Sequence, residues 1–92
     1  MSAVSFQDDP RTGVLTTAPV LAGAPILMVS HDEDDGGWQF LCGTTNDPAD
    51  GRIVHLAAII AMDPTVQAVA DLPFQWIAHR EAVGGEWHRE PR

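Results

Sequence analysis

The chain has 92 residues, and its thirteen acidic residues outnumber five basic ones to give a formal net charge of −8. This length suits one domain with a modest core, and the acidity argues against nucleic acids and anionic membranes, which are bound through clustered Lys and Arg. Cys42 is the single cysteine, which excludes an intramolecular disulfide and a cysteine-based zinc site and favours a reducing cytoplasm.

Residues 1–24 are predicted to be an N-terminal arm and lead-in, and residues 25–92 to be a single α+β domain. The arm is polar and acidic, and two prolines, Pro19 and Pro25, suit an irregular lead-in better than a helix. The segment Val14–Val29 is apolar but interrupted, and it follows acidic residues instead of basic ones. We therefore expect neither a signal peptide nor a membrane-spanning helix.

The stretch from Ile26 to Gly43 is predicted to form a β-hairpin. Two apolar runs, Ile26–Val29 and Trp38–Cys42, flank an acidic linker that ends in Gly-Gly. This pattern is typical of two antiparallel strands, and glycine supplies the backbone freedom that a tight return requires. Every second side chain from Trp38 onward shares one face, which we expect to be buried.

The segment Ile53–Met62 is predicted to be the main helix. Apolar residues recur three and four positions after Leu56, and the intervening alanines are strong helix formers. Because the helix is short and almost wholly apolar, we expect it to be largely buried. Asp63 and Pro64 then begin a second short helix, as its N-cap and first helical residue.

The last two strands are predicted at Phe74–Arg80 and Glu86–Arg89, joined by a turn that contains Gly-Gly. With the first hairpin and the helices, the element order is ββ–αα–ββ. This order predicts an α+β fold in which a small antiparallel sheet of about four strands carries the short helical segment on one face.

From the hairpin onward the sequence resembles a family of small bacterial domains of unknown function. The resemblance rests on the stretches DDGGWQFLCG, IVHLAAIIAMDP and DLPFQWIAHRE and on the closing Trp87. The shared positions are Asp35, Gly37, Trp38, Gly43, Asp63, Pro64, Leu72, Trp76 and Arg80. That family is similar to one grouped with immunity proteins of polymorphic toxin systems. The resemblance therefore implies an immunity-like role, and it carries no catalytic residues.

The acidic linker is the first candidate binding site, formed by Asp32, Glu33, Asp34 and Asp35. Carboxylates suit Ca²⁺ or Mg²⁺, but an EF-hand register that begins at Asp32 places Gly43 where the bidentate glutamate is required. We therefore expect a solvated turn with no metal site and no cofactor. Four acids at a hairpin tip favour electrostatic attraction of a basic partner.

Trp87 and Arg80 form the second candidate binding site. Trp87 lies between charged and polar residues near the C-terminus, so we expect it to be half exposed. An exposed Trp beside Arg80 or Arg89 is typical of an interface anchor. Cys42 lies on the apolar face of its strand and is expected to be a buried hydrophobe instead of a nucleophile.

These features predict a cytoplasmic protein-binding module, either immunity-like or regulatory, that acts through an acidic surface and is not an enzyme. Its partner would be a basic protein such as a toxin. One alternative is a small metal-dependent or hydrolytic enzyme that uses His31, His79 and the Asp32–Asp35 loop, provided that the sheet brings the two histidines together. Another is a structural domain that forms a homodimer through its sheet edges or Trp87.

Overall fold

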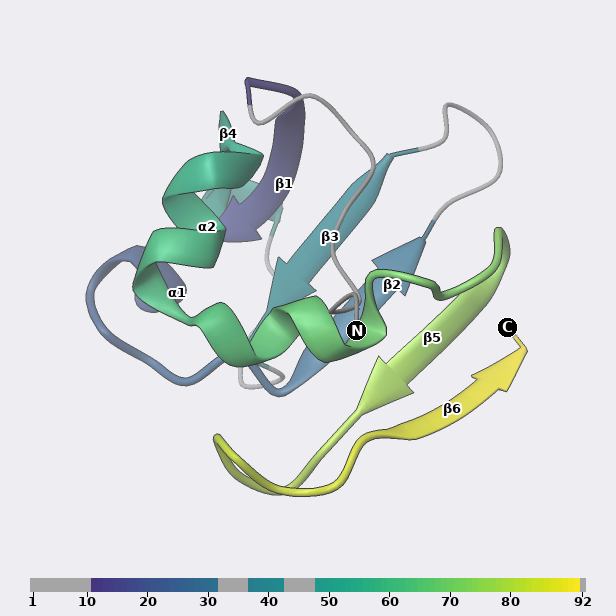
Figure 1. The fold of residues 1–92 in the computed structure, drawn as a ribbon. Helices are drawn as coiled ribbons and strands as arrows, with labels where there is room; N and C mark the ends of the chain where they lie inside the picture. The colour runs from purple at the N-terminus through teal and green to yellow at the C-terminus, as the bar shows by residue number, and fades with distance from the viewer. Residues whose placement is uncertain (1–10, 32–36, 43–47, 92) are drawn as a thin grey trace.

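The computed structural model describes residues 11–31, 37–42 and 48–91, and their strands form one mixed sheet. The spatial order of the strands is β4-β1-β3-β2-β5-β6 (Figure 1). In chain order the strands are β1 (Gly13–Thr17), β2 (Met28–His31), β3 (Trp38–Leu41), β4 (Gly51–His55), β5 (Trp76–His79) and β6 (His88–Pro91). The helical segments are α1 (Ala18–Leu21), η1 (Pro48–Asp50), α2 (Leu56–Met62) and η2 (Pro64–Val69).

The α+β class is confirmed, but the sheet has six strands instead of the predicted four, and its order differs from ββ–αα–ββ. It is also not wholly antiparallel, because β1 runs parallel to β3 and antiparallel to β4. The two additional strands, β1 and β4, pair with each other across a long stretch of sequence. A local sequence pattern does not reveal such a pairing.

β1 and α1 occupy the segment that the sequence analysis assigned to an irregular lead-in. Val14 and Thr16 point into the core, and the Thr16 hydroxyl donates a hydrogen bond to the Phe40 carbonyl (2.7 Å). β-Branched residues favour a strand here. Pro19 lies in the first turn of α1, where a helix does not need its missing N–H. The prolines therefore shape the connection after β1 without preventing regular structure.

The predicted helix at Ile53–Met62 is corrected at its start, because α2 begins at Leu56. The preceding residues, including Ile53 and Val54, form β4, which pairs with β1. Leu56 and Ile59 are buried as the helical spacing predicted. The expectation that the helix is largely buried is wrong, since its remaining surface is exposed at Ala57, Ala58, Ala61 and Met62.

The first hairpin is confirmed as the antiparallel pair β2 and β3. Val29 pairs with Phe40, and His31 pairs with Trp38. Trp38 is 2% exposed and Phe40 is fully buried, as the alternation along β3 predicted. Cys42 is buried beyond the end of the same strand.

The helical segments α2 and η2 lie against one face of the sheet (Figure 1). Leu56 and Ile59 of α2 and Val66 and Val69 of η2 belong to the same buried cluster as the inward side chains of the sheet. The Asp63 carboxylate caps η2 by accepting a hydrogen bond from the Thr65 N–H (3.0 Å), as the Asp-Pro pair predicted. The second helix is of the 3₁₀ type.

The C-terminal hairpin is formed by β5 and β6, both of which start later than predicted. Gln75 has a φ of +67°, which interrupts the extended backbone before β5 begins. Phe74 therefore lies outside the strand and is 57% exposed. β6 begins at His88 instead of Glu86, after a turn in which Gly84 adopts a φ of +83°.

Candidate functional site

A buried cluster around Arg80 supports one end of the helical layer. Its Nε and Nη2 atoms both donate to the Ile26 carbonyl, at 3.0 and 2.9 Å, and Nη1 donates to Thr65 Oγ1 at 2.8 Å. Nη2 also lies 2.7 Å from Asp63 Oδ2. The Arg80 side chain, which directly follows β5, therefore connects the segment before β2 to the junction of α2 and η2.

Trp87 covers this cluster. The Arg80 Cζ atom lies 4.2 Å from the centroid of the Trp87 ring, which is the geometry of a cation–π contact. Trp87 is half-buried and packs against the core, whereas the Arg80 side chain is fully buried. The structure thus brings together the two residues that the sequence proposed for binding. It places Arg80 beneath the surface, with its N–H groups engaged inside the fold.

The other proposed binding residues, Asp32, Glu33, Asp34 and Asp35, lie outside the described residues. The strands that precede and follow them in the chain are described: β2 ends at His31, and β3 begins at Trp38.

The two histidines of the alternative enzyme hypothesis lie on opposite faces of the sheet. His31 pairs with Trp76 and His79 pairs with Met28, so the alternation along β2 turns the two rings to different sides. The His31 ring stacks on Trp38 with centroids 3.8 Å apart, and its Nδ1 lies 2.7 Å from the Leu72 carbonyl, which can only accept.

His79 has a different set of neighbours. Its ring lies 5.6 Å from that of His88, and its Nε2 lies 3.5 Å from Glu90 Oε1. Within residues 11–31, 37–42 and 48–91, no three His, Cys, Asp or Glu side chains gather in a way that could hold a metal ion. The fold therefore does not bring His31 to the side chains around His79.

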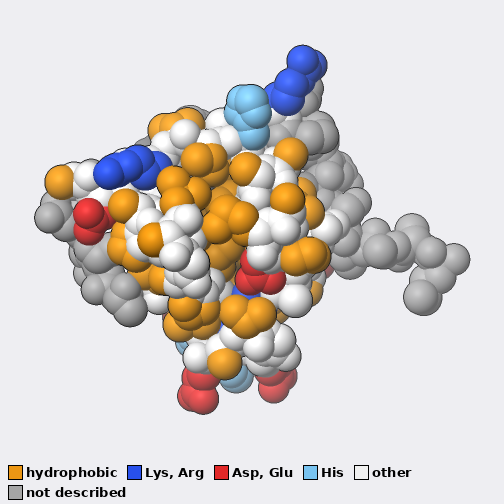
Figure 2. All heavy atoms as spheres, turned by 90° about the vertical axis from the view of Figure 1, so that its left-hand side faces the viewer, with side chains coloured by type: hydrophobic (Ala, Val, Ile, Leu, Met, Phe, Trp, Pro, Cys, Tyr) orange, Lys and Arg blue, Asp and Glu red, His pale blue; other side chains and the backbone are white. Residues whose placement is uncertain are grey.

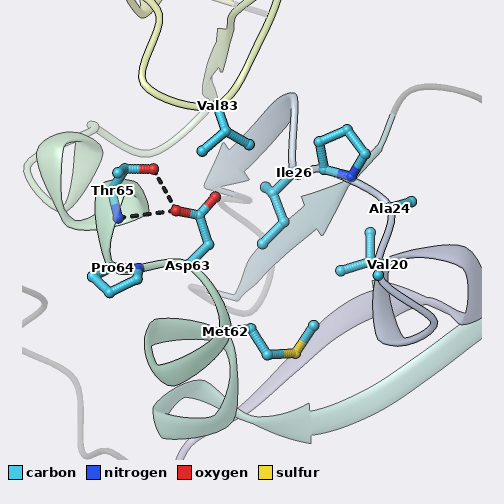
Figure 3. Close-up of a pocket in the computed structure, with 10 residues that line it drawn as sticks. Val20, Ala24, Ile26, Met62, Asp63, Pro64, Thr65 and Val83 are labelled. Atoms are coloured by element: carbon cyan, nitrogen blue, oxygen red, sulfur yellow. Dashed lines mark hydrogen bonds between the residues drawn. The ribbon is translucent and has the colours of Figure 1, made fainter.

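A hollow of about 400 Å³ opens beside the Arg80 cluster. Figure 3 shows Asp63 and Thr65 on one side of it, Val20, Ala24 and Ile26 on the other, and Met62 and Val83 at its two ends. Its walls come from the α1–β2 connection, the α2–η2 junction and the turn between β5 and β6; the remaining lining residues are Gly23, Pro25 and Pro64.

Among the described residues that line the hollow, Asp63 is the one ionisable residue. Its Oδ1 accepts hydrogen bonds from the N–H and hydroxyl of Thr65, and its Oδ2 accepts from Arg80. Both carboxylate oxygens are therefore engaged, and the charge faces a buried guanidinium. The hollow offers an apolar receptacle with a fixed polar wall, which suits binding of an apolar group better than acid–base chemistry.

The rim of the hollow exposes large apolar side chains. Met62 is 45% exposed and Val83 is 53% exposed, and nearby in α1 Leu21 is 42% exposed. Figure 2, seen from the left of Figure 1 where α1, α2 and β4 lie, shows hydrophobic atoms gathered over this side, with most charged side chains toward its margins. Contiguous exposed apolar surface of this kind commonly marks an interaction site.

The hollow was not predicted from the sequence. Its lining is drawn from three segments that are distant in the chain, and each was interpreted as connection, helix end or turn. One feature of the sequence did indicate exposed apolar surface. The stretch LAAIIAM contains no polar residue, so any part of this helix that faces water must be apolar. We interpreted that composition as burial, whereas the structure exposes part of it.

Comparison with protein families, curated proteins and solved structures finds no match to this chain. None of the helices formed by the described residues has the length and apolar character needed to cross a membrane.

Proposed function

We propose that this chain is a cytoplasmic protein-binding module that receives an apolar side chain of its partner in the hollow between Met62 and Val83. The observation that carries the proposal is the combination of a hollow of about 400 Å³ with a rim of exposed apolar side chains. A partner side chain seated there would bury apolar surface that is otherwise in contact with water. Binding needs no catalytic group.

The partner we propose is a basic protein. The chain carries a net charge of −8, and a field of this sign raises the encounter rate with positively charged proteins in a salt-dependent way. Glu81 and Glu86 are exposed in the same turn as Val83, so acidic groups flank the rim of the hollow. The acidic residues 32–35 would add to the same attraction.

An immunity-like role is the form of this function that the sequence resemblance favours. In that role the protein would occlude a basic toxin, and in a regulatory role it would occlude another basic partner. Both roles use the same contact. The Arg80–Asp63 pair supports it by fixing the wall of the hollow before the partner arrives, which lowers the ordering cost of binding.

The test is capture of partners from the native cytoplasm on immobilised protein, followed by identification and quantification of what is retained. Met62→Gln and Val83→Gln, combined, remove apolar surface from the rim without changing charge. Phe74→Gln is the matched control, because Phe74 is similarly exposed at 57% and is not among the residues that line the hollow. Glu81→Gln with Glu86→Gln tests the charge separately.

We expect one or more basic proteins to be retained by the wild type and by Phe74→Gln but lost with the Met62→Gln/Val83→Gln variant. We also expect retention by the wild type to weaken as salt rises, and to weaken at low salt when the two glutamates are neutralised. Equal retention by the rim variant and by the Phe74 control would refute the hollow as the contact.

A further inference from the structure

The C-terminal hairpin places two histidines opposite each other. In the antiparallel pairing of β5 with β6, His79 lies directly opposite His88, and the centroids of their rings are 5.6 Å apart. Directly opposed residues of two antiparallel strands share one face of the sheet. Glu90 comes two positions after His88 in β6, so it lies on this face as well. Its Oε1 atom lies 3.5 Å from His79 Nε2.

These three side chains are accessible from solvent. His88 is exposed, and the side chains of His79 and Glu90 are 45% and 58% exposed. Arg89 is the only Lys or Arg in β5 and β6, and the alternation along β6 turns it to the other face, where it donates to the Asp71 carboxylate. A cation that approaches the histidines therefore meets two imidazole rings and a carboxylate, with no cationic side chain from these two strands beside them.

We propose that His79 and His88 bind one divalent transition metal ion between them. Neutral imidazole is a ligand that suits zinc, copper and nickel. With metal–nitrogen bonds of about 2.1 Å, and about 1.1 Å from each nitrogen to its ring centroid, two rings that share one ion have centroids at most about 6.5 Å apart. The observed separation of 5.6 Å is within this limit, so the strand pairing already holds both rings within reach of a single ion.

The proposed site leaves coordination positions open. No three His, Cys, Asp or Glu side chains of the described residues are placed to hold a metal ion together, so water fills the positions that the two histidines do not occupy. The Glu90 carboxylate beside His79 adds negative charge to the surroundings of the ion, and so does the net charge of −8. Such a site binds an exchangeable ion.

The positions of the two histidines give the ion a structural effect. His79 immediately precedes Arg80 and His88 immediately follows Trp87, so the ion links the two strands at the base of the turn that connects them. An ion that binds only the native state stabilises it by mass action. The melting temperature should therefore rise saturably with metal concentration, whether or not a partner binds in the hollow.

The test is calorimetric titration of the full chain with zinc chloride at a fixed pH of about 8, with the melting temperature followed in parallel. We expect one zinc ion per chain, with saturation below about 1 mM, and a higher melting temperature at saturation. His79→Asn and His88→Asn should each weaken zinc affinity by at least about tenfold, because even the loss of an outer-shell partner of a metal ligand has an effect of this size. Glu90→Gln should weaken it less, since it removes charge but no ligand.

His55→Asn is the matched control, because His55 is an exposed histidine on β4, at the opposite edge of the sheet. This variant should bind zinc as the wild type does, and circular dichroism verifies that every variant is folded. The proposal is overturned if the wild type shows no saturable zinc binding up to about 1 mM, or if one ion binds per two chains. It is equally overturned if His79→Asn and His88→Asn bind zinc as tightly as the wild type, or if His55→Asn loses as much affinity as they do.

Discussion

The Arg80 guanidinium and the Asp63 carboxylate lie 2.7 Å apart, with the Arg80 side chain fully buried and that of Asp63 11% exposed. Asp63 ends α2, caps η2 and forms part of the wall of the hollow, so one ion pair connects the stability of the helical layer to the shape of the proposed binding site. A second ion pair, Arg89 with Asp71 at 2.8 Å, joins β6 to the end of the η2 region on the exposed surface.

The two ion pairs give the first prediction. Asp63→Ala should lower the free energy of unfolding by about 3–5 kcal/mol, because it leaves the buried Arg80 charge without its partner. Asp71→Ala should lower it by less than about 1 kcal/mol, because that carboxylate is 58% exposed and solvent replaces the contact. Urea unfolding of the two variants beside the wild type measures both values; equal losses would contradict the structural role assigned to the buried pair.

The second prediction concerns Trp38, which is 2% exposed and lies between the His31 ring and Phe40. Trp38→Ala should cost about 3–5 kcal/mol, since it removes a large buried side chain and leaves a cavity. Phe74→Ala removes an aromatic ring that is 57% exposed and should cost far less. Thermal unfolding followed by circular dichroism compares them, and a melting temperature of Trp38→Ala within a degree or two of the wild type would show that the core is wrongly assigned.

The third prediction tests whether Trp87 stabilises the folded protein. Trp87→Ala should destabilise the protein by at least about 1 kcal/mol, because the contact with the Arg80 guanidinium is lost and water reaches the buried ion pair. Trp87→Phe retains an aromatic ring over Arg80 and should recover most of that loss. If chemical unfolding shows no difference between Trp87→Ala and the wild type, Trp87 is a surface residue available as an interface anchor.

The fourth prediction concerns the acidic residues Asp32, Glu33, Asp34 and Asp35. Because their spacing does not satisfy a Ca²⁺ loop, millimolar Ca²⁺ or Mg²⁺ should leave the melting temperature nearly unchanged. A cation that binds only the native state must stabilise it by mass action. A large saturable increase that disappears in Asp32→Asn/Asp34→Asn would establish a metal site at these acidic residues.

The sequence predicted the parts of the fold that depend on neighbouring residues. Alternation along Trp38–Cys42 identified the buried face of the first hairpin, and Asp63 with Pro64 identified the start of η2. Pairing of β1 with β4 was not foreseen, because it joins Gly13–Thr17 to Gly51–His55 and neither segment shows its partner in its own pattern.

The candidate site was harder to predict from the sequence than the local elements of the fold, for a similar reason. Arg80 was proposed as a binding residue because it belongs to the family resemblance and was expected to lie near Trp87. The structure does place the Arg80 and Trp87 side chains in contact. Its burial follows from hydrogen bonds to Ile26 and Thr65, which are distant in the chain. The hollow depends on the same long-range contacts, because Met62 and Val83 lie at its opposite ends only after the sheet has formed.

The most direct test of the proposed function is amide NMR of the labelled chain with the basic partner retained in the capture experiment. We predict that the largest shift changes fall in three stretches around the hollow, at residues 23–26, 62–65 and 82–84, and that Met62→Gln/Val83→Gln abolishes them. Shift changes confined to residues 32–35, with none around the hollow, would contradict the account.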